Sequence, residues 1–294
     1  MTAKVAIVGA GHTGRALGLA LARAGWRIGA VCNRTMERAR ESAAFIGAGE
    51  PCDDPARAAG DAELVLVTVP DGAIAEVAER LRPAAGAAAA HACGALPAEA
   101  LAAVRRHGAH AGAIHPLRSF ADPRLAADRF AGTFCAVDGD EAAVERLESM
   151  VRAIGGRPAR LDGGRKALYH AGAVFASNYV VAVLEAALRL FDAAGVPRGD
   201  ALAPLLALAG GTLENVRAVG IPAALTGPVE RGDADTVRAH AWALREGAPG
   251  LAEAYAALAR LACEVALAKG TIDAAAAGRI NTEIAGGMTG IRLP

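Results

Sequence analysis

The sequence predicts an α/β protein with two domains: a doubly wound, mostly parallel sheet followed by an all-helical part. Three observations lead to this prediction. A glycine-rich turn at 9–14 lies between an apolar run at 4–8 and a helical pattern at 13–24. Strand-like and helical runs then alternate as far as residue 161, and no β-rich run remains after Gly164. We therefore expect the domains to cover residues 1–163 and 164–294.

The first half consists of short apolar runs separated by amphipathic ones, as expected when strands are buried on both faces. Strands are predicted at 4–8, 28–32, 63–69, 87–92, 109–114, 132–137 and 157–161, and helices at 13–24, 35–47, 72–82, 97–107 and 140–154. In such sheets ligands lie beyond the carboxyl ends of the strands. The loops at 69–73, which begin with Val69 and Pro70, and at 115–120 are therefore expected at the ligand edge.

The second half contains helical patterns alone, at 165–191, 198–209, 211–218, 233–245, 248–269 and 273–281. The first of these is predicted as one long helix that is apolar nearly all round. Such a helix must be buried in a core or in a subunit interface. We therefore expect a homodimer that forms through the helical domain.

Each glycine of the first turn has a distinct role in a dinucleotide-binding fingerprint of the Rossmann type. Gly9 allows the tight turn, Gly11 lets the backbone approach a pyrophosphate, and Gly14 lets the next helix pack closely on the strand. His12 and Thr13 begin that helix, whose free N–H groups and positive dipole end suit a phosphate. The strand–turn–helix context supports the dinucleotide interpretation over a turn with a purely structural role.

The second predicted strand ends at Asn33, where an NAD enzyme usually carries a carboxylate for the ribose hydroxyls. The chain continues with Arg34 and Thr35, and Arg38 lies one turn further on. Arg34 could pair with a 2′-phosphate and lie against the adenine ring, while Thr35 could donate its hydroxyl. These residues favour NADP(H) over NAD. The alternative is a helix N-cap beside a solvated arginine.

Composition excludes several classes of function. The 294 residues are 53% hydrophobic and carry no formal net charge, which argues against nucleic acid or an anionic membrane surface as partner. The chain begins directly with a strand pattern, so we expect no signal peptide, and charges or glycines interrupt the longest apolar stretches, so we expect no membrane-spanning helix. Five scattered cysteines without a CxxC motif are expected to be buried thiols in a reducing cytoplasm: Cys32, Cys52, Cys93, Cys135 and Cys263.

A polar stripe on the first helix of the second half is a candidate catalytic feature. Lys166, His170 and Ser177 share one narrow face, and Asn178 lies at its edge. Polar groups on a buried helix need partners, which suggests that the stripe lines a cleft. Lys166 could protonate a carbonyl oxygen as hydride arrives, or stabilise the alkoxide. The alternative is a lysine that snorkels at a helix start and a histidine that is satisfied in the core.

Two loops carry further candidate residues. His115 ends a predicted strand at the ligand edge, where it could orient substrate, and Ser119 follows in the same loop. Arg231 lies in a polar loop between helices and could grip a substrate carboxylate, or it could pair with Asp233, which begins a helix. A histidine anchored by a backbone carbonyl is the alternative for His115. The remaining histidines and cysteines show no metal-ligand spacing, so no metal is predicted.

Taken together, these segments resemble the Rossmann-like proteins that carry a C-terminal helical domain of unknown function, 2520. The segments that carry the resemblance are GAGHTG, NRT, VPDGAI, AIHPLRSF, YHAGAVFASNY and LTGPVERGD. The wider group resembles 6-phosphogluconate dehydrogenase and includes ketopantoate reductase and pyrroline-5-carboxylate reductase. The resemblance implies an NADPH-binding domain and a helical dimerisation domain. In ketopantoate and β-hydroxyacid enzymes of this group an active-site lysine precedes an asparagine by four residues. Lys166 matches the lysine, and His170 replaces the asparagine.

The resulting hypothesis is an NADP-dependent oxidoreductase that transfers hydride to a small 2-oxo acid, similar to ketopantoate reductase. In this hypothesis Lys166 is the acid, and His115 and His170 position the substrate. One alternative is an imine reductase of the pyrroline-5-carboxylate type, for which Lys166 would be less necessary. Another is a non-catalytic NADP(H)-binding regulatory protein.

Overall fold

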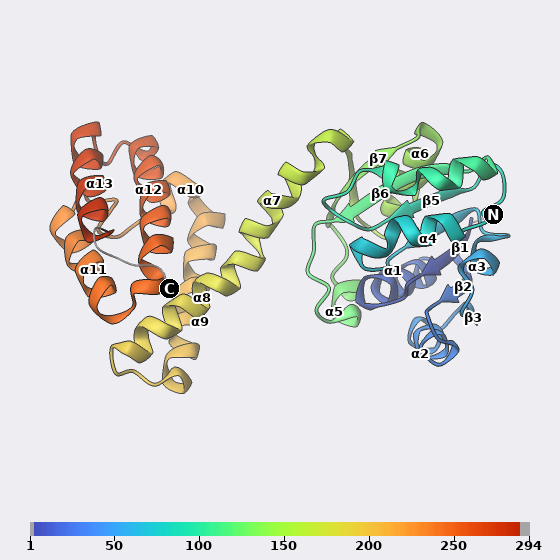
Figure 1. Cartoon of the computed structure of the whole chain (residues 1–294), viewed down its shortest axis with the longest axis horizontal. Coiled ribbons are helices and arrows are strands. Elements are labelled where there is room, and N and C mark those ends of the chain that lie inside the picture. The colour runs from blue at the N-terminus through green and yellow to red at the C-terminus, as the bar shows by residue number, and fades with distance from the viewer. Residues whose placement is uncertain (1–2, 289–294) are drawn as a thin grey trace. The chain divides into compact units, whose positions relative to one another are not determined.

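The computed structural model describes residues 3–288, which form two compact units that divide between Ser177 and Asn178 (Figure 1). The first unit is a sheet with helices, and the second is helical, as the sequence predicts. The predicted boundary after residue 163 precedes α7 (Lys166–Ala176), whereas the structure places α7 in the first unit. Side-chain contacts of Lys166 and Tyr169 with the sheet, described below, explain this difference.

The sheet has eight strands in the order β3-β2-β1-β4-β5-β6-β7-β8. Neighbouring strands are parallel except β6 and β7, which are antiparallel. The order reverses between β1 and β4, which creates the crevice where such sheets bind ligands. The strands are β1 (Lys4–Val8), β2 (Arg27–Cys32), β3 (Glu50–Cys52), β4 (Leu64–Val67), β5 (Ala88–His91), β6 (His110–Pro116), β7 (Phe134–Gly139) and β8 (Arg157–Arg160). The short β3 was not predicted.

Apolar cores cover both faces of the sheet, because successive residues of a strand point to opposite sides. In β1, Val5 and Ile7 join the core with α1, α2 and α6, whereas Ala6 and Val8 join the core with α3, α4 and the 3₁₀ helix η2. The helical elements of this unit are α1 (His12–Arg23), α2 (Met36–Ile46), α3 (Pro55–Ala59), η1 (Asp71–Ala73), α4 (Ile74–Arg80), η2 (Ala98–His107), α5 (Pro123–Asp128), α6 (Glu141–Ala153), η3 (Gly163–Arg165) and α7.

Four predicted helices differ from the structure. The segment predicted as a helix at 97–107 is the 3₁₀ helix η2. The predicted helix at 165–191 is interrupted at Ser177, whose φ of −129° and ψ of −72° are not helical, so α7 and α8 are separate. The helices predicted at 198–209 and 211–218 form the single helix α9, which continues through Gly210 and Gly211.

The second unit consists of helices with two small cores. Leu188, Ala201 and Leu205 pack α8 on α9, and a separate core joins α11, α12 and α13. The elements are α8 (Asn178–Ala193), α9 (Arg198–Val219), α10 (Ile221–Ala224), α11 (Ala234–Gly247), η4 (Pro249–Leu251), α12 (Ala252–Lys269) and α13 (Ala274–Met288).

The helical segment Gly163–Ala193 is long and apolar enough to cross a membrane by length and composition, because 18 consecutive residues within it have a mean hydropathy of 1.6. Gly172 and Glu185 interrupt this segment, as expected, and the absence of a membrane-spanning helix stays a prediction. The segment is also divided at Ser177, and Lys166 near its start is buried against the sheet.

Candidate active site

In the glycine turn between β1 and α1, the backbone conformation and the packing require a glycine at position 9 but not at position 11. Gly9 has a φ of +85°, and a Cβ there would collide with Val69. At Gly11, in contrast, φ is −77°, and a Cβ would meet only the Gly9 carbonyl oxygen, at 4.0 Å. Because no protein group occupies this space, Gly11 leaves the backbone open to a ligand, as a pyrophosphate would need.

The N-terminus of α1 offers its amides without competition from the protein. No side chain caps this end, and the first turn of the helix contains no acidic residue. The uncapped N–H groups and the dipole therefore favour an anion at His12 and Thr13. Gly14 serves the packing instead, because a Cβ there would lie 3.1 Å from Ile7 Cγ2 and would collide with Thr68.

A cleft of about 820 Å³ runs from this turn along the carboxyl ends of β2 and β4. It brings together predicted cofactor residues from three loops, namely Gly9, Gly11, Asn33, Arg34, Arg38, Val69 and Pro70. The cleft also includes residues that the sequence did not single out, among them Asp53, Glu76 and Arg80. Its size and its position at the sheet crevice suit a dinucleotide.

Some of the residues after β2 are held by hydrogen bonds within the protein, and others are exposed and free to bind a ligand. Asn33 Nδ2 donates to the Arg38 carbonyl and to Ser42 Oγ, both at 3.0 Å, and Ser42 Oγ donates to the Ala10 carbonyl at 2.9 Å. Thr35 caps α2 by accepting the Arg38 N–H, a cap that both the NADP interpretation and its alternative predict. Arg34 and Arg38 are exposed, and the described residues give neither guanidinium an ion-pair partner.

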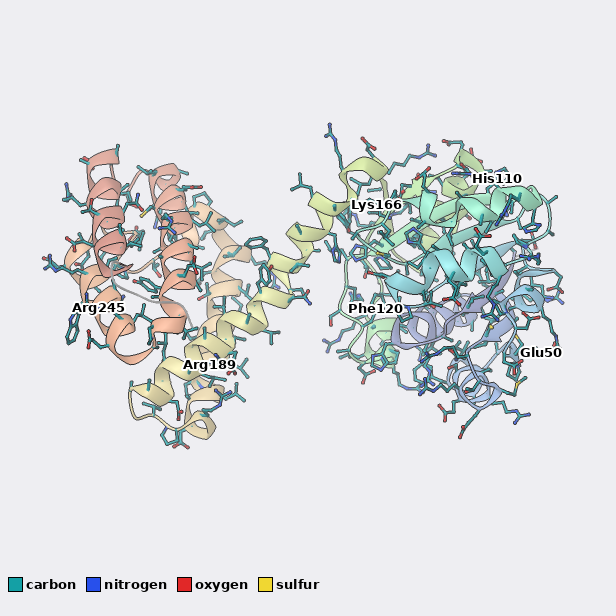
Figure 2. All side chains as sticks on the ribbon, viewed as in Figure 1. Glu50, His110, Phe120, Lys166, Arg189 and Arg245 are labelled. Atoms are coloured by element: carbon teal, nitrogen blue, oxygen red, sulfur yellow. The ribbon has the colours of Figure 1, made fainter. Side chains whose placement is uncertain are left out.

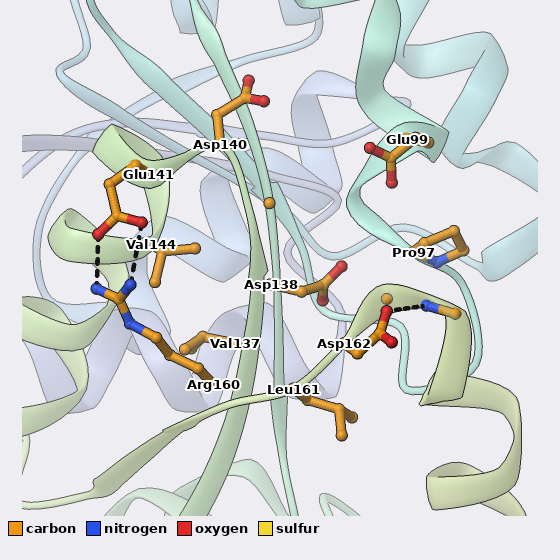
Figure 3. A pocket seen from close by; sticks show the side chains of 13 residues that line it. Pro97, Glu99, Val137, Asp138, Asp140, Glu141, Val144, Arg160, Leu161 and Asp162 are labelled. Carbon is orange, nitrogen blue, oxygen red and sulfur yellow. Dashed lines mark hydrogen bonds and ion pairs between the residues drawn. The ribbon is translucent and has the colours of Figure 1, made fainter.

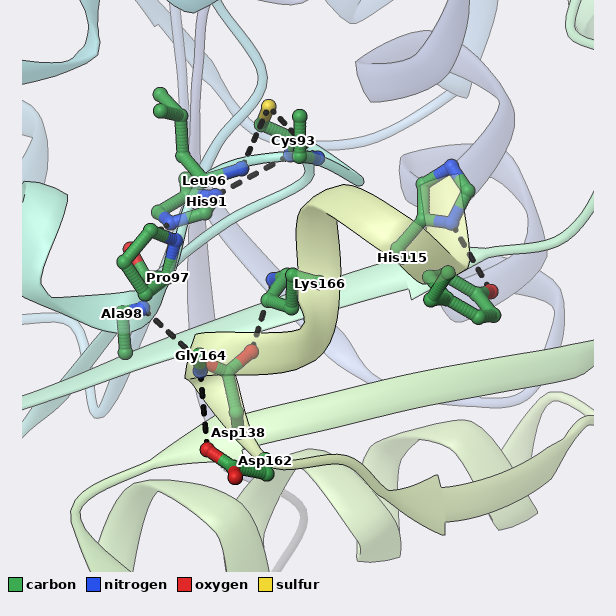
Figure 4. A network of polar contacts seen from close by, with 12 residues as sticks. His91, Cys93, Leu96, Pro97, Ala98, His115, Asp138, Asp162, Gly164 and Lys166 are labelled. Atoms are coloured by element: carbon green, nitrogen blue, oxygen red, sulfur yellow. Dashed lines mark hydrogen bonds and ion pairs between the residues drawn. The ribbon is translucent and has the colours of Figure 1, made fainter. Parts of the chain in front are cut away.

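Lys166 begins α7 (Figures 2 and 4). Its side chain is completely buried. Its Nζ donates to Asp138 Oδ1 at 2.8 Å, and Asp138 Oδ2 accepts the Ala98 N–H at 2.9 Å. The ammonium therefore faces a carboxylate of the sheet unit. This contact also fixes the first turn of α7 against β7 and η2.

His115, near the end of β6, meets two aromatic residues from the next part of α7. Its Nδ1 lies 3.1 Å from the Tyr169 hydroxyl, which is the dashed contact at His115 in Figure 4. The ring of His115 also lies edge-to-face with that of His170, at 5.5 Å between centroids. Burial, with the neighbouring His170 and Lys166, lowers the pKa of His115 to about 4. The imidazole of His115 is therefore neutral near pH 7.

Gly94, in the turn after β5, lies directly against both histidines. A Cβ there would collide with His170 and would lie 2.8 Å from His115 Nε2. His91 shapes this turn: its Nδ1 accepts the Cys93 N–H at 3.2 Å, and its Nε2 donates to the Pro97 carbonyl at 2.9 Å. Sequence reasoning missed Gly94, although a glycine shortly after a strand at the ligand edge was the available signal.

The four predicted substrate residues are divided between the two units. Ser119 is exposed in the loop after β6, and Ser177 ends the first unit. Asn178 begins the second unit, which also contains Arg231 in an exposed position. Asp233 caps α11 by accepting the Thr236 N–H, while no ion pair between Arg231 and Asp233 is present among the described residues.

A second cavity, of about 530 Å³, lies beside β7 and the N-terminus of α6 (Figure 3). Its lining is acidic, but every carboxylate has a partner. Asp138 forms an ion pair with Lys166, Glu99 and Asp140 each form one with Arg105, and Glu141 forms one with Arg160. Asp162 accepts a hydrogen bond from the Gly164 N–H. Among residues 3–288, no group of three or more His, Cys, Asp or Glu side chains could hold a metal ion.

The fold and the turn define a Rossmann-type protein with a helical second unit. Residues 1–116 match the family model of the Rossmann-like domain, and residues 133–262 match that of the domain of unknown function DUF2520. These two matches confirm the resemblance drawn from the sequence motifs. No curated protein matches the chain significantly.

Solved structures with the same fold include named oxidoreductases. A Bacteroides fragilis protein named as an NADP oxidoreductase is 25% identical, with a TM-score of 0.73 over 90% of this chain and 98% of its own. A Thermotoga maritima protein whose name gives no activity is 28% identical, with a TM-score of 0.71 over 90% and 99%. An imine reductase from Myxococcus stipitatus, in complex with NAD⁺, shares the fold at 19% identity, with a TM-score of 0.62 over 95% and 99%.

Proposed function

We propose that the protein is an NADP(H)-dependent oxidoreductase that transfers hydride between the nicotinamide and a small molecule. The observation that carries the proposal is the open backbone at Gly11 beside the uncapped N-terminus of α1, within a cleft that also contains Arg34 and Arg38. The names of the related structures, an NADP oxidoreductase and an imine reductase, agree with this activity. The bound cofactor supplies the hydride, and the protein supplies binding, orientation and charge.

The preference for NADPH depends on Arg34 and Arg38, since Asn33 replaces the carboxylate that would repel a 2′-phosphate. We expect Arg34→Ala to weaken NADPH binding by about 10- to 100-fold, because a charged hydrogen bond contributes roughly 1.5–3 kcal/mol. NADH binding should change little. Calorimetric titration of both cofactors measures the effect, with Arg40→Ala as control, since Arg40 is exposed on α2 outside the cleft. Equal affinity of the unaltered protein for NADPH and NADH would contradict the 2′-phosphate argument.

For the substrate, the cluster at His115 favours a C=N bond over the 2-oxo acid that the family resemblance suggests. Reduction of a ketone needs a proton donor for the oxygen. Lys166, the predicted donor, is buried and paired with Asp138, while His115 is neutral. An iminium ion already carries its proton, so it can accept hydride without an acid. A ketopantoate-like 2-oxo acid remains the alternative substrate, with Lys166 as acid.

A panel of substrates separates these possibilities. NADPH oxidation is followed with ketopantoate and other 2-oxo acids, with cyclic imines, and with mixtures of ketone and amine. Turnover of imines that survives the removal of Lys166 supports the C=N assignment. Turnover of 2-oxo acids that depends on Lys166 supports the alternative. Tight NADPH binding without turnover of any member would favour a non-catalytic NADP(H)-binding regulatory protein and contradict the proposed activity.

The protein also functions, in this proposal, as a homodimer in a reducing, cytoplasmic environment. Large apolar side chains of α7, α8 and α9 are exposed, including Leu168, Val181 and Leu208. A second copy of the chain would cover them, as large exposed apolar surfaces usually require. The five cysteines are free and buried, which agrees with a reducing compartment. Sedimentation equilibrium should show a dimer at micromolar concentration, and a monomer would contradict this assignment.

A further inference from the structure

Tyr169 is the polar neighbour of His115 in the proposed active site. It lies in α7 three residues after Lys166, whose ion pair with Asp138 fixes the start of that helix. The Tyr169 and His115 rings meet edge-to-face at 5.5 Å, with an interplanar angle of 86°. Among residues 3–288, the Tyr169 hydroxyl has one hydrogen-bond partner, His115 Nδ1 at 3.1 Å. The position of this hydroxyl is thus set by a buried anchor one helical turn away.

The direction of this hydrogen bond follows from the chemistry of the two groups. A neutral imidazole has one N–H donor and one acceptor nitrogen, while a phenol is a good donor. Burial raises the pKa of Tyr169, so the phenol keeps its proton, and the lowered pKa of His115 keeps the imidazole neutral. Between two uncharged groups, the phenol O–H is a better donor than an imidazole N–H, and the bare ring nitrogen is a better acceptor than a phenol oxygen. We therefore assign the Tyr169 O–H as the donor to Nδ1, which leaves the ring proton of His115 on Nε2.

The opposite edge of the His115 ring carries a donor without a protein partner. His115 Nε2 lies beside Gly94, where a Cβ would approach it to 2.8 Å, and the His170 ring flanks the same point. No hydrogen bond from Nε2 is present among the described residues. The charged or titratable groups that act on His115 are His170, Lys166 and Asp71. An N–H group without a partner beside a glycine is available to a bound molecule.

We propose that Tyr169 is a positioning residue for the active site: its hydroxyl holds His115 in the tautomer that presents an Nε2–H donor toward the substrate. This inference rests on the proposed reductase function. In this role the Nε2–H of His115 donates a neutral hydrogen bond to an acceptor atom of the substrate, an oxygen or the nitrogen of an imine before it is protonated, and His115 does not give up its proton; the nitrogen of an iminium ion has no lone pair and is not that acceptor. Tyr169 itself does not touch the substrate.

Nitrogen NMR of the full-length protein with ¹⁵N-labelled histidine tests the inference without a substrate. His115→Gln assigns the signals. In the unaltered protein we expect Nε2 to carry the proton and Nδ1 to show a strongly hydrogen-bonded acceptor signal. In Tyr169→Phe, the ¹⁵N chemical shift of Nδ1 should change to the value of an unprotonated ring nitrogen that accepts no hydrogen bond. A proton on Nδ1 in the unaltered protein would overturn the proposal without any variant.

Tyr255→Phe is the matched control, because Tyr255 makes the same contact with another histidine. Its hydroxyl lies 3.0 Å from His240 Nδ1, in the second unit. We expect Tyr255→Phe to alter the signals of His240 and to leave those of His115 unchanged.

Kinetics then test the catalytic consequence. With the best substrate of the panel, Tyr169→Phe should lower kcat/KM about tenfold, the effect of losing one oriented hydrogen bond of ~1.4 kcal/mol. NADPH affinity should stay within about twofold, because Tyr169 does not line the cofactor cleft. Unchanged kcat/KM, or an unchanged Nδ1 signal, would overturn the positioning role. If the unaltered protein does not bind NADPH at all, the proposed function is overturned instead.

Discussion

Replacing Lys166 by methionine distinguishes a structural cation from a catalytic one. The side chain is buried, and its Nζ lies 2.8 Å from Asp138 Oδ1, with 0% and 6% of the two side chains exposed. At an effective dielectric constant of about 20, these charges attract each other by roughly 6 kcal/mol before any desolvation is subtracted. Methionine fills a similar volume without the charge, so the carboxylate of Asp138 would remain buried with only the Ala98 N–H as partner.

We expect Lys166→Met to destabilise the sheet unit by about 3–5 kcal/mol, the usual cost of removing one member of a buried pair. For a unit of this size, the unfolding temperature should fall by roughly 6–20 °C. Denaturant and thermal unfolding measure both quantities. Arg198→Met is the control, because Arg198 pairs with Glu185 at the surface of the second unit, and the sheet unit should be unaffected.

The double variant Lys166→Met with Asp138→Asn removes both charges and keeps an acceptor for the Ala98 N–H. It should recover most of the lost stability, since no unpaired charge remains buried. If Lys166 is structural, imine turnover should recover with stability. A stable double variant without turnover would show that the ammonium itself acts in the reaction. A loss below about 1 kcal/mol in the single variant would refute the buried-pair argument.

Three further predictions follow from the same unit. Gly94→Ala should place a Cβ 2.8 Å from His115 Nε2 and lower turnover about 10- to 100-fold through displacement of the imidazoles, with NADPH affinity unchanged by titration. Gly11→Val should fold normally, since φ there is −77°, yet bind NADPH at least tenfold more weakly; unchanged binding would refute the pyrophosphate assignment. The pKa of His115 is lowered to about 4 in the native protein. Between about pH 6.5 and pH 4 the unfolded chain therefore binds a proton at His115 that the native protein does not. The free energy of unfolding should fall by roughly 3 kcal/mol as the pH drops through this range. Urea unfolding should show a flatter pH dependence in His115→Asn.

The parts of the fold that sequence predicted are those with local rules. The strand–turn–helix signature around Gly9 and Gly11 can be recognised from a few consecutive residues. Gly9 is required by the sterics of its own turn, and Gly11 leaves the backbone accessible to a ligand. The alternation of runs gave most strands of the sheet for the same reason. The sequence does not predict the short strand β3 or the 3₁₀ conformation of η2, because both depend on packing against elements distant in sequence.

The environment of Lys166 could not be read from its own helix. The stripe with His170 was correctly identified as polar, but whether it faces a cleft or a carboxylate depends on Asp138, which lies 28 residues earlier on β7. Helical periodicity specifies a face and does not specify what covers that face. The same applies to His91, whose two partners, Cys93 and Pro97, create the turn that carries Gly94.

The charge state of the cluster links its geometry to the choice of substrate. A free ammonium about 4 Å from an iminium ion would oppose binding by roughly 4 kcal/mol at an effective dielectric constant of 20, whereas it would attract the carboxylate of a 2-oxo acid equally strongly. Asp138 neutralises Lys166, and His115 and Tyr169 are both uncharged near pH 7. Among the described residues, the cations of the cofactor cleft without an ion pair are Arg34 and Arg38, which lie beyond β2, and Arg80 in α4. A site built in this way separates the positive charge that suits a phosphate from the neutral surface that tolerates a cationic C=N bond. The same surface gives a 2-oxo acid no free cation for its carboxylate.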